Sequence, residues 1–368
     1  MKIIKLSKRV FFALAILFTC TFFIFLSEVH AVFYQLITPE QLQDSGLRIV
    51  WQHKLPIVEA ERLKQIFIID NRIYVLTDFN YIFALDRDNG SPMFNRQFIE
   101  TGLPMQGLAV QNNMLFFIAG NKLIEADVET GEKISSKELE FGITCPAARN
   151  NSFFYIAGTD KRLHALRAED RVKIFKVAAE NESVITSILA EEDFVYFSTD
   201  AGNVICITSS GPKRLWEFKA GGAVIGPIVK DGDAIYFASK DTHVYRINSL
   251  TGKFEWKYAT GQLLDKGLTV AKNAVYQNIP EKGLVAISKK QGKIIWQLSE
   301  GVDLLAELES KAYILTSSSK IAVMDNEKAQ RIHIVHVPLV SRHISNLVDS
   351  KMYLADESGR ISCLEPIK

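Results

Sequence analysis

The sequence predicts an all-β fold, an eight-bladed β-propeller in which four-stranded antiparallel blades form a ring. Three observations lead to this prediction. A strand pattern around one aromatic residue recurs about every forty residues, a turn glycine follows at a fixed distance in several copies, and the four tryptophans fall at matching positions. A repeat of this length is typical of architectures whose units cannot bury a hydrophobic face alone.

The first repeated element is a strand with an aromatic side chain at its centre. Copies such as NRIYVL, DFVYFS and DAIYFA share this pattern. The aromatic residues are Tyr74, Phe116, Phe154, Tyr196, Tyr236, Tyr276, Tyr313 and Tyr353, and neighbouring copies are 37 to 42 residues apart. Eight copies with so little variation predict eight equivalent sheets, with the differences taken up in loops.

A second strand and a tight turn follow in each copy. Ala84-Leu-Asp86 represents this strand, and the turn glycines are Gly90, Gly131, Gly252 and Gly292. Glycine supplies the positive φ that such turns need. Another strand lies upstream of each aromatic, as in residues 223–229. Each unit therefore holds four short strands and no crossover helix.

The strand after the turn carries a large aromatic in most copies, which we interpret as a plug between neighbouring blades. These residues are Trp51, Phe94, Phe175, Trp216, Trp256 and Trp296, and they include every tryptophan of the chain. His333 and Ser135 occupy the same position in two other copies. Burying one such side chain contributes on the order of 2–3 kcal/mol per blade, before any stacking.

The two ends of the chain are predicted to complete one blade together. The last copy has no outer strand after residues 359–364, whereas residues 46–55 match the outer strand of another copy in the spacing of glycine and tryptophan. Pairing these two segments closes the ring and removes the open sheet edges that template aggregation. The propeller is therefore predicted to span residues 47–368.

Residues 1–31 are predicted to be a targeting segment. A positive flank precedes the uncharged run of residues 10–26, and residues 29–31 resemble a small-residue cleavage site. The run is longer than a signal-peptide core of about 7–15 residues and matches a short spanning helix of roughly 17–25. A cleaved signal peptide, a retained membrane anchor and lipidation at Cys20 are the three alternatives. In each case the chain that follows is exported, to the periplasm or another extracytoplasmic site.

Residues 32–46 are predicted to form a short helical linker. Thr38 suits the N-cap, Pro39 the first turn and Gly46 the end of such a helix. We expect this linker to space the ring from the membrane.

Charge and cysteine content limit the possible functions further. Lys and Arg number 43 against 42 acidic residues, and a net charge of +1 gives no basic field to attract nucleic acid. Cys206 and Cys363 belong to copies on opposite sides of the ring, too far apart for a disulfide. Together with Cys145 they are expected to be buried thiols.

The recurring pattern Ala-x-Asp-x-x-Thr-Gly-Lys-x-x-Trp, seen in residues 84–94 and 246–256, points to a known family. It resembles the tryptophan-docking motif of quinoprotein-like propellers, the pyrroloquinoline-quinone (PQQ) repeat family. The exported, single-ring layout is similar to that of the outer-membrane protein assembly scaffolds of this family. The resemblance implies a rigid propeller that holds partner proteins of the cell envelope without catalysing a reaction.

The same family includes quinone-dependent alcohol and sugar dehydrogenases, whose sites contain an adjacent cysteine pair, a calcium ion and an acidic base. The sequence has no Cys-Cys pair, and its regular repeats leave no room for the insertions that build those sites. His333 and His336 point to opposite faces of a strand and cannot easily share a metal ion. We therefore expect no PQQ cofactor, no metal site and no catalytic residue. A PQQ-dependent dehydrogenase and a membrane-anchored sensor or carbohydrate-binding propeller are the alternatives.

Overall fold

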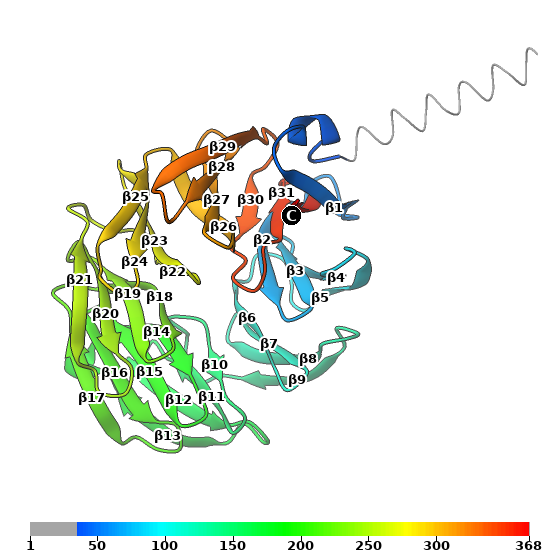
Figure 1. Cartoon of the computed structure of the whole chain (residues 1–368). Coiled ribbons are helices and arrows are strands. Elements are labelled where there is room, and N and C mark those ends of the chain that lie inside the picture. Colours follow the sequence, from blue (N-terminus) through cyan, green and yellow to red (C-terminus); the bar gives the residue numbers. More distant parts are fainter. Residues whose placement is uncertain (1–34, 368) are drawn as a thin grey trace, which may run out of the picture.

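The structure is a ring of eight four-stranded antiparallel sheets (Figure 1). It is a computed structural model that describes residues 35–367. The predicted all-β fold with eight propeller blades is confirmed. The predicted targeting segment, residues 1–31, lies outside the described residues. Within the described part of the chain, no helix is long and apolar enough to cross a membrane.

Seven of the blades follow one another along the chain, and the eighth combines the two ends. Blade 1 contains β2 (Leu63–Ile69), β3 (Arg72–Thr77), β4 (Tyr81–Asp86) and β5 (Pro92–Gln97), and blade 2 contains β6 (Met105–Gln111), β7 (Met114–Ala119), β8 (Lys122–Asp127) and β9 (Lys133–Glu138). Blade 3 contains β10 (Ala148–Arg149), β11 (Phe153–Ala157), β12 (Arg162–Arg167) and β13 (Lys173–Ala178), and blade 4 contains β14 (Ile185–Ala190), β15 (Phe194–Thr199), β16 (Asn203–Thr208) and β17 (Arg214–Lys219). Blade 5 contains β18 (Val224–Asp231), β19 (Ala234–Ser239), β20 (His243–Asn248) and β21 (Phe254–Ala259), and blade 6 contains β22 (Thr269–Val270), β23 (Ala274–Ile279), β24 (Gly283–Ser288) and β25 (Ile294–Leu298). Blade 7 contains β26 (Gly301–Leu308), β27 (Lys311–Thr316), β28 (Lys320–Asp325) and β29 (Gln330–His336), and blade 8 contains β30 (Arg342–Ile344), β31 (Met352–Ala355), β32 (Arg360–Pro366) and β1 (Leu47–Lys54). In this order, which we call A to D, the first strand of each blade lies nearest the centre of the ring (Figure 1).

The second and third strands of each blade form the core because their side chains are apolar on both faces. In β3, every residue from Ile73 to Thr77 is buried, and in β4 every residue from Ile82 to Leu85 is buried. A continuous apolar run of this length is typical of a strand that is covered on both sides. The outer strands alternate instead, as in β21, where Trp256 is buried between exposed neighbours. One face of each outer strand packs on the next blade, and the other meets solvent.

The ring is closed by the strand nearest the N-terminus. β1 pairs antiparallel with β32, from Leu47 opposite Pro366 to Lys54 opposite Arg360, and completes the order β1-β32-β31-β30. Trp51 lies opposite Cys363 in this register. The predicted joining of the two chain ends is confirmed, and blade 8 has no open edge at β32.

The segment before β1 packs on the ring. Its helix is the single 3-10 turn η1 (Pro39–Leu42), which begins at a proline. Leu36 and Ile37 are buried in the cluster between blades 7 and 8, and their backbone N–H groups donate to Gln52 Oε1 at 3.1 and 3.0 Å. Leu36, Ile37 and Leu42 thus supply apolar contacts to the interface where His333 stands in place of an aromatic plug.

The alternation of strand direction gives the ring two distinct faces. Connections from A to B and from C to D lie on one face, which we call the A–B face, and those from B to C and from D to A lie on the other, the D–A face. A–B connections are two or three residues long, except residues 345–351 of blade 8. D–A connections reach nine residues, in 139–147 and 260–268, and one of them contains the short helix η2 (Glu180–Glu182). The longer and more adaptable loops therefore gather on the D–A face.

Candidate protein-interaction face

Four of the six predicted plug residues lie between blades, where each contacts the glycine turn of the following blade. A Cβ atom placed on Gly252 of blade 5 would lie 2.6 Å from the Trp216 ring of blade 4. The pairs Trp51–Gly90, Phe94–Gly131 and Trp256–Gly292 repeat this contact at 2.5 or 2.6 Å. The four glycines have φ between +65° and +72°. Glycine is thus required both for the turn and for the approach of the neighbouring ring.

The tryptophan plugs also form hydrogen bonds between blades. The indole N–H groups of Trp51, Trp216 and Trp256 donate to the carbonyls of Arg87, Ser249 and Lys289 at 3.1, 3.0 and 2.9 Å. Trp296 faces the turn of blade 7, in which Ala329 at φ +53° takes the place of glycine. The Trp296 indole N–H donates to Asn326 Oδ1 of this turn at 2.7 Å. Each bond satisfies a donor that packing would otherwise leave buried and unpaired. Phe175 has no such donor and is only half-buried, near Phe153.

An ion-pair network replaces the aromatic plug between blades 2 and 3. The Ser135 hydroxyl, at the plug position, donates to the buried Glu125 carboxylate at 2.7 Å. Glu125 pairs with Arg149 at 3.1 Å and with Arg171. Arg171 has φ +59° and stands at the turn position that glycine holds in other blades. A buried carboxylate with two guanidinium partners therefore links these blades, and removing it would leave charges uncompensated.

Large apolar side chains are exposed on the D–A face. They are Val58, Leu103, Leu263 and Leu339, with 59%, 48%, 66% and 47% of their surfaces accessible, and each lies in a different D–A connection. Three of these connections are consecutive around the ring, at the junctions of blades 7 and 8, 8 and 1, and 1 and 2. Leu250, Leu347 and Val348 are also exposed on the A–B face, but in two connections that are not neighbours. The run of three adjacent loops therefore distinguishes the D–A face as the candidate binding surface.

The D–A face also holds a pocket of about 740 Å³ beside the ring closure. It is lined by Lys54, Ile57, Val58, Glu59, Glu61, Arg62, Ser341, Asp356, Glu357 and Ser358. These residues come from the end of β1, from the D–A connections into blades 1 and 8, and from the B–C turn of blade 8. The pocket combines apolar and charged groups, and its volume is sufficient for a side chain or a short segment of a partner.

Comparisons with known proteins agree with this geometry. Residues 181–303 match the family described as outer membrane protein assembly factor BamB. The crystal structure of BamB from Moraxella catarrhalis matches with a TM-score of 0.68 and 14% identity, over 87% of this chain and 97% of that one. The fold is that of a PQQ-repeat, BamB-like propeller.

The computationally designed Ika8 protein is similar in fold to the BamB-like ring, with a TM-score of 0.68 and 13% identity. The match covers 86% of this chain and 99% of the designed one. A search of curated proteins found no match in sequence. At these identities the likeness concerns the fold, because one fold hosts many functions.

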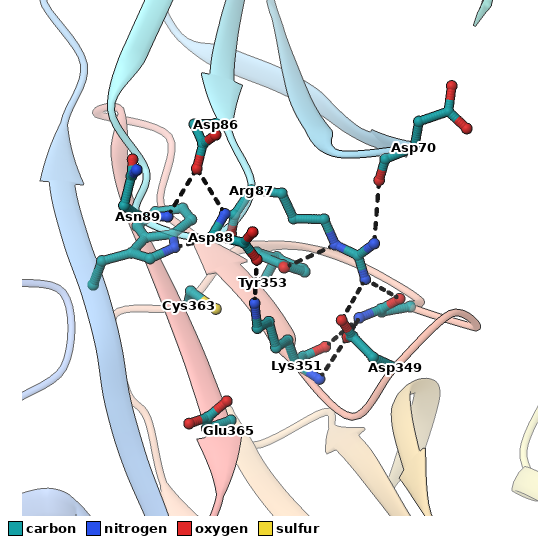
Figure 2. Close-up of polar contacts among 12 residues, drawn as sticks. Asp70, Asp86, Arg87, Asp88, Asn89, Asp349, Lys351, Tyr353, Cys363 and Glu365 are labelled. Carbon is teal, nitrogen blue, oxygen red and sulfur yellow. Dashed lines mark hydrogen bonds and ion pairs between the residues drawn. The ribbon is translucent and has the colours of Figure 1, made fainter.

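Polar contacts on the A–B face of this BamB-like ring tie blade 1 to blade 8. Figure 2 shows the Arg87 side chain between the two blades. Its guanidinium donates to the Tyr353 hydroxyl at 3.1 Å and pairs with Asp349 at 2.8 Å, while Lys351 pairs with Asp88 at 2.7 Å. Side chains on the A–B face therefore hold blade 1 against blade 8, while the β1–β32 ladder joins the two ends of the ring within blade 8.

The structure of the BamB-like ring shows where the predicted buried thiols lie. Cys145, Cys206 and Cys363 are free and buried, and burial raises the pKa of each thiol to about 12. His343 on β30 lies 3.2 Å from Asp303 on β26, between two A strands. Among residues 35–367, no group of three or more His, Cys, Asp or Glu side chains is placed to hold a metal ion.

The contact between a plug and the glycine of the next blade was missed in the sequence. Trp256 follows Gly252 by four residues, which suggests one local unit, yet Gly252 meets Trp216 and Trp256 meets Gly292. An alignment of the copies would have indicated that the aromatic–glycine contact is replaced between blades 2 and 3. Ser135 replaces the aromatic in one copy, and Arg171 replaces the glycine in the next.

Proposed function

We propose that this protein is an exported, non-catalytic scaffold of the cell envelope that binds partner proteins on its D–A face during outer-membrane protein assembly. The observation that carries the proposal is the display of Val58, Leu103, Leu263 and Leu339 on one face of a BamB-like ring. The match of residues 181–303 to the BamB family supports the assembly role.

The blade contacts suit the ring to a scaffold role. Plug aromatics and the Glu125 network fix blades relative to their neighbours, and the β1–β32 ladder completes the blade that closes the ring. A partner that binds a preorganised surface loses less free energy to ordering than one that binds mobile loops. Apolar surface removed from water contributes roughly 25 cal/mol per Å², so covering the exposed leucines of the D–A face with a partner would stabilise the complex.

Affinity capture from envelope extracts tests the proposal. The wild-type ring is expected to retain outer-membrane β-barrel assembly components, and the variant L103S/L263S/L339S is expected to lose most of them. The matched control is L250S/L347S, which removes exposed leucines from the A–B face. Equal capture by both variants would contradict a D–A binding face, and capture of no envelope protein by the wild type would contradict the scaffold.

The proposed scaffold needs no quinone. Purified protein is incubated with PQQ and calcium ions, passed through a desalting column and examined by absorbance. We expect no retained chromophore and no alcohol or sugar dehydrogenase activity. A stoichiometric, retained chromophore with activity would replace the scaffold by a quinone-dependent enzyme.

A further inference from the structure

The pocket beside the ring closure contains an acidic side chain that the ring itself satisfies only in part. Glu61 is 3% exposed, and one carboxylate oxygen accepts the backbone N–H of Val58 at 3.2 Å. The other oxygen, Oε1, has no hydrogen-bond partner within residues 35–367. A buried carboxylate oxygen without a donor is costly, because the ionised form needs hydrogen bonds or a cation.

Most of the other charged groups that line the pocket already have a partner. The Lys54 ammonium donates to the backbone carbonyl of Ser358. Asp356 pairs with Arg360 at 2.6 Å, and Glu357 pairs with Arg342 at 2.8 Å. The Arg62 guanidinium donates to the backbone carbonyl of Glu61 at 2.9 Å and so does not occupy its Oε1. Glu59 also lines the pocket but is exposed to solvent, so Glu61 Oε1 is the buried acidic oxygen of the pocket that lacks a donor.

The loop that carries Glu61 is held in place at both ends. The Leu55 N–H donates to the Gly359 carbonyl and the Leu63 N–H to the Glu357 carbonyl, both at 2.9 Å. Gly359, at φ +89°, leaves space for Ile57, whose Cδ1 would lie 2.9 Å from an added Cβ. The pocket wall is therefore formed before any partner arrives, which lowers the cost of binding.

We propose that this pocket receives a basic side chain, lysine or arginine, from a protein partner of the ring. Glu61 Oε1 accepts the charged group, while the aliphatic stem packs on Ile57 and on the exposed face of Val58. Long basic side chains bury their stems on apolar surface in this way, and an ion-paired hydrogen bond is stronger than a neutral one. The inference rests on the proposed binding role of the D–A face and adds the chemistry that the partner must present.

Direct binding of short peptides to the purified ring tests the inference. The probes are a fluorescein-labelled Gly-Ser-Ala-Lys-Ala-Ser-Gly peptide, the same peptide with arginine, and one with norleucine, which keeps the stem and lacks the charge. Anisotropy is measured with wild-type protein, with E61Q and with the control E281Q, which alters an exposed acid in a distant turn of the same face. Circular dichroism verifies that each variant is folded.

The lysine and arginine peptides are expected to bind the wild type and E281Q alike, and to bind E61Q at least about tenfold more weakly, a loss of about 1.4 kcal/mol. The norleucine peptide is expected to bind the wild type about as weakly as the lysine peptide binds E61Q. Equal affinity of E61Q and wild type would overturn the inference. Binding to phosphatidylethanolamine vesicles that depends on Glu61, without peptide binding, would also overturn it by assigning the pocket to a lipid amine. Neither result depends on capture from extracts, so failure of this inference is distinguishable from failure of the scaffold.

Discussion

Substituting Gly252 by alanine is expected to destabilise the ring by about 2–5 kcal/mol. An L-residue at φ +66° costs about 1–2 kcal/mol from backbone strain alone. The new Cβ would lie 2.6 Å from Trp216, well inside the ordinary carbon contact of about 3.5–4.0 Å, so the indole must move away. Displacing it breaks the 3.0 Å hydrogen bond to the Ser249 carbonyl and leaves buried groups unpaired, which costs a further 1–3 kcal/mol or so.

Gly232 in the same blade provides the control. Its φ is +59°, but nothing lies within 4 Å of an added Cβ, so G232A measures the backbone strain alone, about 1–2 kcal/mol. Urea unfolding followed by circular dichroism gives the free energy of each variant. In a W216A background, G252A is expected to cost no more than G232A, because the clashing ring is gone. Equal losses for G252A and G232A in the wild-type background would refute the cross-blade contact as a source of stability.

Two further predictions concern buried polar groups. E125Q is expected to destabilise the ring by about 3–5 kcal/mol because Arg149 and Arg171 lose their common counter-charge, whereas E129Q, in an exposed pair with Arg72, is expected to change stability by less than about 1 kcal/mol in the same urea assay. Burial raises the folded-state pKa of the three thiols to about 12, above the ordinary value of 9.0. The contribution of the protonated thiols to the free energy of unfolding is therefore complete below about pH 9 and is lost as the pH rises through about 12. The free energy of unfolding should fall over this range, and a slope unchanged in C145A/C206A/C363A would contradict the assignment.

The sequence predicted the features that repeat. The aromatic series from Tyr74 to Tyr353 marks every blade because each occupies an equivalent buried strand, and hydrophobic burial imposes the same requirement eight times. Trp51 was assigned to the closing strand because its spacing from Gly46 matches that of Trp216 from Gly211. Periodic burial leaves a periodic signal, and the ring could be derived from it.

Contacts that depend on the circular arrangement had no such signal. Trp216 contacts Gly252 in the turn of the next blade. The glycines nearest to Trp216 in the sequence, Gly211 and Gly221, do not contact it. Leu36 and Ile37 join the interface of blades 7 and 8 from a segment without strand or helix periodicity. Glu61 is one acid among many in the sequence, and only the fold shows that its Oε1 is buried without a donor.

The pairing of β1 with β32 has a consequence for biosynthesis. The first strand of the ring leaves the ribosome more than three hundred residues before its partner exists, so it must wait, unpaired, while seven complete blades accumulate behind it. A transcript cut short before Arg360 would yield a stack of sheets with two bare ends, a species suited to capture by chaperones or proteases. The closing blade can therefore form only after β32 has been synthesised.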